Sequence, residues 1–184
     1  MVAPAEVVVD RARFWSMIQA AKTISGRKLE QQTDLLEEQL RGLPPSEIVS
    51  VQRILEELHA ESWRIDLWGA AFTIDPEIRN EDRFFAFRGW LVGQGQHVYT
   101  AAVAEPDSLA DYADLQTDWP QGSGLPWFWG EGIWCVALEA YEDLIGGDIP
   151  GLHGWPGTLV GEWWEHEAEL RRRYLRLWAR FRRD

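Results

Sequence analysis

The apolar residues of this chain recur with the period of an α-helix along most of its length. They fall every three or four positions in segments that glycine, proline and short polar residues separate, as in amphipathic helices with their capping residues. No segment alternates apolar and polar residues as a half-buried strand does. The pattern predicts an all-α fold with helices at 11–22, 28–40, 46–58, 60–74, 82–93, 97–104 and 133–144, a helical turn at 106–112 and a helix after residue 170.

The segment 82–93 predicts a helix that its neighbours cover on more than one side. Phe84, Phe87 and Arg88 share one face, whereas Phe85 and Val92 lie on another, so little of its surface is left for solvent. We expect it to be the central helix, with the 60–74 helix beside it. Small residues at 69–71 of that neighbour would let another backbone or a ligand come close.

The region 119–161 differs in composition from the rest of the chain. It holds ten of the sixteen glycines and four of the nine prolines, and it is rich in tryptophan. Disordered segments are poor in aromatic residues, so we expect an ordered aromatic loop that packs against the helices. A chain of 184 residues with 46% hydrophobic content is long enough for one buried core, and we predict a single domain over 1–184.

Charge narrows the classes of partner. The net charge of −12 repels phosphates, which argues against nucleic acid and anionic membranes. No run approaches the roughly 20 apolar residues of a membrane span. The tail after Leu170 holds seven arginines and an apolar stripe, so we expect it to dock on the acidic body. One cysteine and a short, charge-interrupted apolar start predict a cytoplasmic protein.

Two charges stand alone in apolar helices, Asp66 and Arg88. Buried charges require partners. The pattern favours an internal salt bridge between them, and the alternative is a pocket in which Arg88 binds a ligand carboxylate or phosphate.

Tryptophan residues could form the walls of such an Arg88 pocket. The stretch "LPWFWGEG" places Trp127 and Trp129 in the predicted loop, either as a staple on the core or as an aromatic lid. Any ligand site would lie where this loop meets the Trp63 to Trp68 helix with Arg88 beneath it. The candidate binding residues are therefore Trp63, Asp66, Trp68, Arg88, Trp127 and Trp129.

The sequence contains little evidence for a metal site or for a catalytic site. Glu56 and His59 make one Glu-x-x-His step, and Glu162, His166 and Glu169 share a second helix face, but a di-metal bundle needs two such steps with further carboxylates. We predict no metal and no cofactor, and no residue is assigned as catalytic because no nucleophile motif is present.

Several segments resemble a known family. "DLWGAAF", "DRFFAFRGWLVGQG" and "EPDSLADY", with "RFW" before them and "GEWWEHEAELRRRYLRLWARF" at the end, are similar in order and spacing to the bacterial domain of unknown function 4240. The resemblance implies a mostly helical domain with a family-like core at about 11–112, followed by the loop and C-terminal helices at 113–184, and it names no reaction.

Function is open between three hypotheses. The leading one is a binding or protein-interaction domain, because no catalytic groups assemble in the sequence. The alternatives are an enzyme or small-ligand protein with a pocket at Asp66 and Arg88, and an acidic neutraliser of a basic partner such as a toxin. The oligomeric state is left open.

Overall fold

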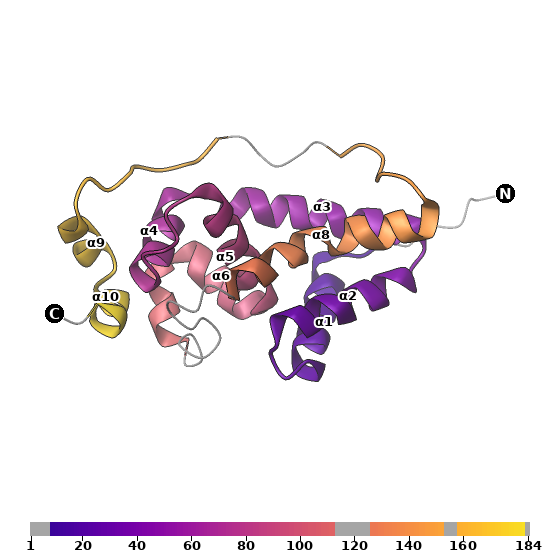
Figure 1. The fold of residues 1–184 in the computed structure, drawn as a ribbon, viewed down its shortest axis with the longest axis horizontal. Helices are drawn as coiled ribbons and strands as arrows, with labels where there is room; N and C mark the ends of the chain where they lie inside the picture. The colour runs from indigo at the N-terminus through magenta and orange to yellow at the C-terminus, as the bar shows by residue number, and fades with distance from the viewer. Residues whose placement is uncertain (1–7, 113–125, 153–157, 183–184) are drawn as a thin grey trace.

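The computed structural model describes residues 8–112, 126–152 and 158–182, with only the backbone at 126–129. The described residues are helical with no strand, which confirms the predicted all-α class (Figure 1). The elements are α1 (Arg11–Ile24), α2 (Leu29–Arg41), α3 (Pro45–Ser62), α4 (Ile65–Ile74), α5 (Glu81–Gly93), α6 (Gln96–Ala104), the 3-10 helix η1 (Pro106–Asp111), α8 (Pro126–Ile145), α9 (Glu167–Arg173) and α10 (Leu175–Phe181).

Local sequence signals set several of these boundaries. The Asp10 carboxylate accepts a hydrogen bond from the Arg13 amide at 2.8 Å, and the Asn80 side chain accepts one from the Arg83 amide at 3.0 Å, so each caps the helix that follows it. Pro45 occupies the first turn of α3, where its missing N–H costs nothing.

The predicted 60–74 helix is divided in the structure. α3 ends at Ser62 and α4 begins at Ile65, and between them Arg64 has extended backbone angles. The Ile65 amide donates to the Val160 carbonyl at 2.8 Å, and Val160 forms an isolated bridge with Arg64. Backbone groups near residue 65, which a continuous helix would pair internally, therefore bond to the segment before α9 instead.

α5 lies at the centre of the fold, as predicted. α8 packs against α5 so closely that only glycine fits at the two positions where their backbones meet. A Cβ atom on Gly89 would lie 1.9 Å from the Gly130 carbonyl oxygen, and one on Gly130 would lie 1.9 Å from the Ala86 oxygen. α8 also contacts α2, and a Cβ atom on Gly132 would lie 2.9 Å from Thr33. The two glycines of α8 thus permit helix contact.

This packing corrects the prediction of a long aromatic loop. α8 begins at Pro126 instead of near residue 133, so Trp127 and Trp129 belong to a helix. The prediction was wrong because it took glycines at 130 and 132 as loop residues, whereas α5 and α2 leave no room for larger ones. The rest of the expected loop falls partly outside the described residues.

The C-terminal tail docks on the body, as predicted, in the form of two short helices at one end of the molecule (Figure 1). Leu170, Tyr174 and Leu177 are buried. The Asp107 carboxylate accepts hydrogen bonds from the Arg176 and Leu177 amides at 3.1 and 2.9 Å, which caps the N-terminus of α10.

The tail arginines bind main-chain carbonyls at the ends of other helices. Arg182 donates to the Phe72 and Thr73 oxygens in the last turn of α4 at 3.1 and 3.2 Å. Arg180 donates to the Ala110 and Tyr112 oxygens at the end of η1 at 2.7 and 2.8 Å. These carbonyls lack helical partners and carry partial negative charge, so each arginine caps a helix C-terminus.

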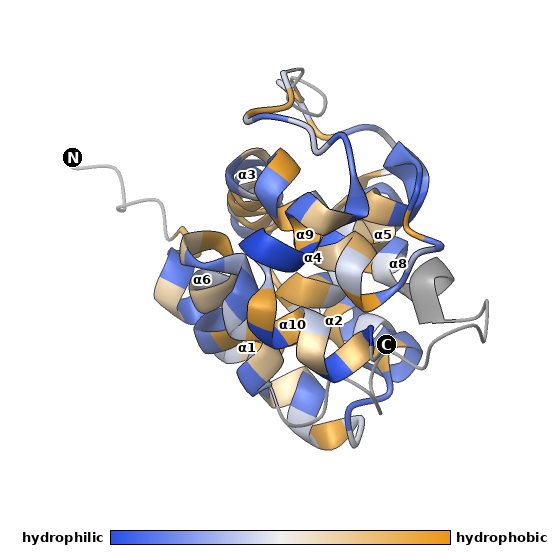
Figure 2. Ribbon diagram, turned by 90° about the vertical axis from the view of Figure 1, so that its left-hand side faces the viewer, coloured by the Kyte–Doolittle hydropathy of each residue, from blue (hydrophilic) through white to orange (hydrophobic). Residues whose placement is uncertain are grey.

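Figure 2 shows polar and hydrophobic residues on most of the helices. The hydrophobic sides meet in one core, in which the largest enclosed side chains are Trp90, Trp134, Phe84, Phe87 and one cation, Arg88. Long polar side chains are rarely fully buried without a partner, so Arg88 marks the place where core and candidate site coincide.

Candidate functional site

The predicted pair of Asp66 and Arg88 does not form. Asp66 instead binds Arg64 through both oxygens, with Arg64 Nε at 2.9 Å from Oδ1 and the Arg64 terminal nitrogen in closer contact with Oδ2. Its Oδ1 also accepts the Leu67 amide at 2.8 Å in the first turn of α4. The Asp66 side chain is 38% exposed. The prediction was wrong because a nearer arginine and a helix N-terminus hold this carboxylate at the surface.

Arg88 is buried, with 1% of its surface exposed, and no carboxylate among the described residues forms an ion pair with it. Its two terminal nitrogens lie 3.1 Å from the His59 carbonyl oxygen and 3.0 Å from His59 Nε2. The guanidinium stands over the rings of Trp63 at 4.5 Å and Phe84 at 4.9 Å. Cation–π contacts and two acceptors replace the missing anion, and burial still lowers the pKa of Arg88 to about 9.

His59 is the partner that the sequence did not identify. Burial, together with the charge of Arg88, lowers the pKa of His59 to about 3, so the ring is neutral at physiological pH. Because a guanidinium can only donate, Nε2 is the acceptor and the ring proton resides on Nδ1. The ring also packs edge-on against Trp134 at 5.2 Å. The Glu-x-x-His spacing of Glu56 and His59 suggested a metal ligand. In the structure, Nε2 of His59 faces the Arg88 guanidinium, and this positive charge disfavours a metal ion at that nitrogen.

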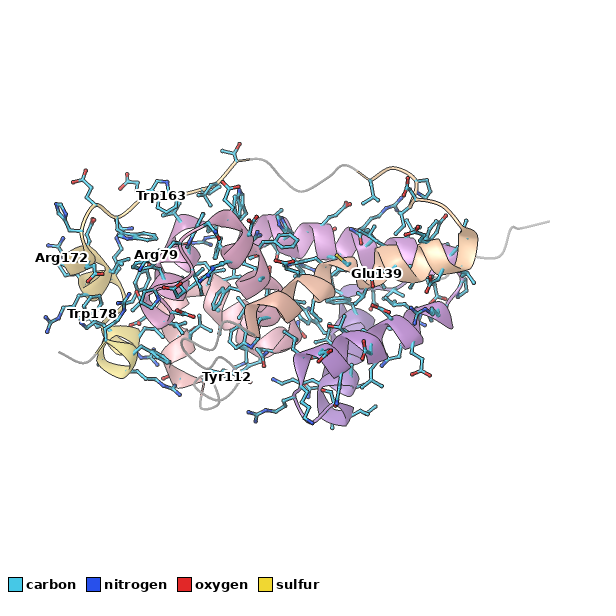
Figure 3. All side chains as sticks on the ribbon, in the orientation of Figure 1. Arg79, Tyr112, Glu139, Trp163, Arg172 and Trp178 are labelled. Carbon is cyan, nitrogen blue, oxygen red and sulfur yellow. The ribbon has the colours of Figure 1, made fainter. Side chains whose placement is uncertain are left out.

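The aromatic candidates Trp63 and Trp68 lie in a column of rings. Trp68 stacks on Phe84 at 4.7 Å, Phe84 on Trp63 at 5.8 Å, and Trp163 meets Trp68 edge-on at 5.0 Å. Trp163 is 52% exposed and lies at the outer edge of the molecule (Figure 3). The column therefore connects the surface to Arg88. The side chains of Trp127 and Trp129 lie outside the described residues, so their place in a pocket remains a prediction.

The small residues of α4 receive the tail of the same chain. A Cβ atom on Gly69 would lie 2.6 Å from the Tyr174 hydroxyl oxygen, and that hydroxyl donates to the Asp66 carbonyl at 2.7 Å. Gly69 thus allows close packing of α4 with the residue between α9 and α10.

Asp66 itself borders a small surface hollow of about 290 Å³. Its charged lining residues are Glu61, Arg64, Asp66, Glu162 and Arg173. Each of the two arginines already binds a carboxylate: Arg64 binds Asp66, and Arg173 binds Glu169 at 3.1 Å. Both arginines of the hollow are therefore already paired, and its three carboxylates disfavour an anionic ligand.

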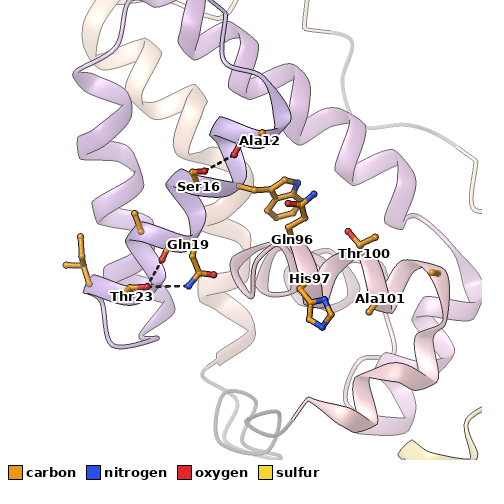
Figure 4. A pocket seen from close by; sticks show the side chains of 12 residues that line it. Ala12, Ser16, Gln19, Thr23, Gln96, His97, Thr100 and Ala101 are labelled. Carbon is orange, nitrogen blue, oxygen red and sulfur yellow. Dashed lines mark hydrogen bonds between the residues drawn. The ribbon is translucent and has the colours of Figure 1, made fainter.

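A different feature emerges between α1 and α6, where an open groove of about 1280 Å³ crosses the surface (Figure 4). We call it the α1–α6 groove. It contains no Asp, Glu, Lys or Arg, and its lining is formed by Ala12, Trp15, Ser16, Gln19, Ala20, Thr23, Ile24, Gln96, His97, Thr100, Ala101 and Ala104.

The polar groups of α1 in this groove are satisfied within their own helix. The Ser16 hydroxyl donates to the Ala12 carbonyl at 2.9 Å, and the Thr23 hydroxyl donates to the Gln19 carbonyl at 2.8 Å (Figure 4). Covering these hydroxyls would leave their O–H donors satisfied, which lowers the desolvation cost. The sequence carried a signal for this face, because the outward positions of α1 between 14 and 21 are uncharged.

A second cluster lies on the contact between α2 and α8. Arg41 binds Glu37 and Asp143, each at 2.9 Å. A hydrogen bond to Glu37, together with partial burial, raises the pKa of Glu139 to about 7 (Figure 3). Burial, with the charges of Glu139, Glu131 and Glu37, raises the pKa of Cys135, which makes that thiol a poor nucleophile.

Metal ligands and membrane spans are not evident in the described part of the chain. No three His, Cys, Asp or Glu residues there are grouped to hold an ion. None of its helices combines the length and apolarity that crossing a bilayer requires. The absence of a cofactor remains a prediction.

The architecture is that of an all-α domain built around α5 and α8, with no catalytic constellation recognised in its described residues. The chain belongs to the family described as Protein of unknown function (DUF4240), whose profile matches residues 9–143. This match confirms the resemblance over residues 9–143, which contain the expected family-like core and most of α8, and it does not reach the C-terminal helices. Comparison with curated proteins and with solved structures gave no match.

Proposed function

We propose that this domain is a protein-interaction module and that the α1–α6 groove is its contact face. The observation that carries the proposal is the absence of Asp, Glu, Lys and Arg from all twelve lining residues, in a chain of which 26% is charged. Solvent-facing sides of helices carry both charged and polar residues, and here only the polar ones are present. The buried cores of protein interfaces are likewise depleted of charge.

The dimensions of the groove support a protein partner over a small molecule. Its volume of about 1280 Å³ exceeds the roughly 300–1,000 Å³ typical of ligand pockets, and it is open along two helices. Ala12, Ser16 and Ala20 lie four residues apart and leave room for another backbone. Ile24 is 69% exposed at the end of α1, where a partner would cover it.

Affinity capture from the cells that produce the protein tests this proposal. The full chain is compared with Ala20→Arg, which places a charge in the groove, and with Ala168→Arg, which makes the same change at an exposed position of α9. We expect Ala20→Arg to lose its bound protein and Ala168→Arg to retain it. Equal capture by all three proteins would refute the groove as the contact face.

A small anionic ligand is a second candidate, and one observation favours it. The Arg88 Nε and Trp63 Nε1 atoms are buried without a hydrogen-bond acceptor in the described residues. A carboxylate or phosphate that reached either atom would supply one. Native mass spectrometry of protein from its own host provides the test: an adduct that Arg88→Lys weakens supports this candidate, and a mass equal to the bare chain argues against it.

The compartment is also part of the proposal. The single cysteine, Cys135, is a free thiol, which suits a reducing compartment such as the cytoplasm. The third hypothesis, an acidic neutraliser of a basic partner, predicts binding that weakens steeply with salt, and the groove has no charge with which to produce that dependence.

A further inference from the structure

We infer that the partner of the α1–α6 groove is a second copy of this chain, joined through an antiparallel pair of α1 helices. This inference rests on the proposed function, because it takes the groove to be a protein contact face. Three observations support it: the order of large and small residues along α1, the neutralised charges at the groove's edge and the net charge of the whole chain.

The sequence of α1 is self-complementary across a two-fold axis at the level of residue 18. In an antiparallel pair centred there, Ala12 of one copy faces Ile24 of the other, and Ser16 faces Ala20. The large exposed side chain of Ile24 thus meets an alanine, one of the four in the lining, at the opposite end of α1. A symmetric dimer requires such matching of a surface with itself.

Small residues at the crossing point permit close packing. Ser16 and Ala20 would lie at the centre of the pair, about one helical turn apart on each copy, and helices with small contact residues approach to about 8 Å between axes. The C-terminal part of the α6 wall, with Thr100, Ala101 and Ala104, also consists of small residues, and Gln96 and His97 form its N-terminal part. The small residues are the part of the wall that a second α1 helix would approach most closely.

The charges at the edge of the groove are already neutralised. Arg11 binds Glu61 at 2.8 Å and lies 3.7 Å from Glu57, and Arg13 binds Glu47 at 2.6 Å. Neither arginine would face its own symmetry mate in the antiparallel arrangement. These two arginines therefore add no like-charge repulsion between two copies.

The net charge of −12 makes an uncharged face the favourable place for self-association. Two copies repel at long range, and salt screens that repulsion over a Debye length of about 10 Å at 0.1 M. Dimerisation should thus strengthen as salt is added. Binding of a basic partner would weaken as salt is added. The sign of the salt dependence therefore distinguishes self-association from binding of a basic partner.

Sedimentation equilibrium of the full chain at low and high salt tests the inference, with Ile24→Arg as the variant. Ile145→Arg, at an exposed isoleucine of α8, is the matched control. We expect a dimer that tightens with salt, that Ile24→Arg weakens at least tenfold and that Ile145→Arg leaves unchanged. A dimer unaffected by Ile24→Arg would refute the inference.

A cross-link fixes the register. In a Cys135→Ser background, mixing Ser16→Cys with Ala20→Cys should give a disulfide-linked heterodimer on oxidation, because these positions face one another across the axis. In the control mixture, Gln31→Cys, at an exposed position of α2, replaces Ser16→Cys. This mixture should give no disulfide-linked heterodimer. A monomer whose groove binds a different protein would overturn this inference and leave the proposed function standing.

Discussion

Arg88 donates to both the main-chain oxygen and the ring nitrogen of His59, so a buried cation is held by a neutral imidazole and aromatic faces. The arrangement links α3 to α5 at the centre of the fold. Burial, and then the positive charge of Arg88, lower the pKa of His59 to about 3, because a protonated ring would be a second buried cation beside the first.

This relationship predicts energetic coupling between the two residues. His59→Ala should cost on the order of 3 to 5 kcal/mol, because it removes an acceptor from a buried charge. Arg88→Met should cost less, since it removes the charge as well, and the double variant should cost much less than the sum. Urea denaturation measures all three. Asp66→Asn combined with Arg88→Met is the control and should be additive, because Asp66 binds Arg64.

The Glu37–Glu139 contact predicts that stability falls as pH rises from about 4.5 to 7. The raised pKa of Glu139 means that the folded state binds its proton more tightly than the unfolded state in that window. Arg41 offsets part of the repulsion among Glu37, Glu139 and Asp143.

Glu139→Gln should remove this dependence and raise the Tm relative to the parent at pH 8, with little difference at pH 4.5. Glu142→Gln, at an exposed position of the same helix, should leave the slope unchanged. An equal pH slope in the parent and Glu139→Gln would show that this contact does not control the dependence.

The contact between α5 and α8 predicts a strong requirement for glycine. Gly130→Ala places a Cβ atom 1.9 Å from the Ala86 oxygen, so the helices must separate, at a cost on the order of 3 kcal/mol or more. Gly147→Ala has open space around the new atom and should stay within about 0.5 kcal/mol of the parent. Thermal unfolding compares them, and equal Tm values would contradict the close packing.

Docking of the tail predicts that removing residues after Leu170 lowers the stability of the whole domain. A milder pair of variants tests the same point: Leu177 is fully buried and Leu175 is 65% exposed in the same helix. Leu177→Ala should cost roughly 2 to 5 kcal/mol, and Leu175→Ala should cost little. If both left the Tm unchanged, the tail would be an arm that contributes nothing to the fold.

The helices were predictable from the sequence because their apolar periods and caps are local signals. Asp10, Asn80 and Pro45 lie at helix starts, and the apolar stripe of the tail indicated its docking. The start of α8 was not predictable, since glycine signals flexibility until a neighbouring backbone is known to occupy the space. The break before α4 likewise depends on Val160, which is remote in sequence.

The site was predicted less well than the fold. Arg88 and Trp63 do come together, but the acceptor for Arg88 is His59, and choosing it over Asp66 requires the three-dimensional distance. The α1–α6 groove was not predicted, because its signal in the sequence is only a run of uncharged residues on one side of α1. The position of α6, which forms the second wall, is not a local property of that run.

Photo-crosslinking in the producing cells tests the central claim most directly. A photoreactive amino acid at Ser16 lies in the α1–α6 groove, and one at Gln31 is exposed on α2. The groove position should give one discrete protein adduct, with a second copy of this chain as the expected species, and the α2 position should give none. Adducts at Gln31 with none at Ser16 would contradict the assignment of the groove as the contact face.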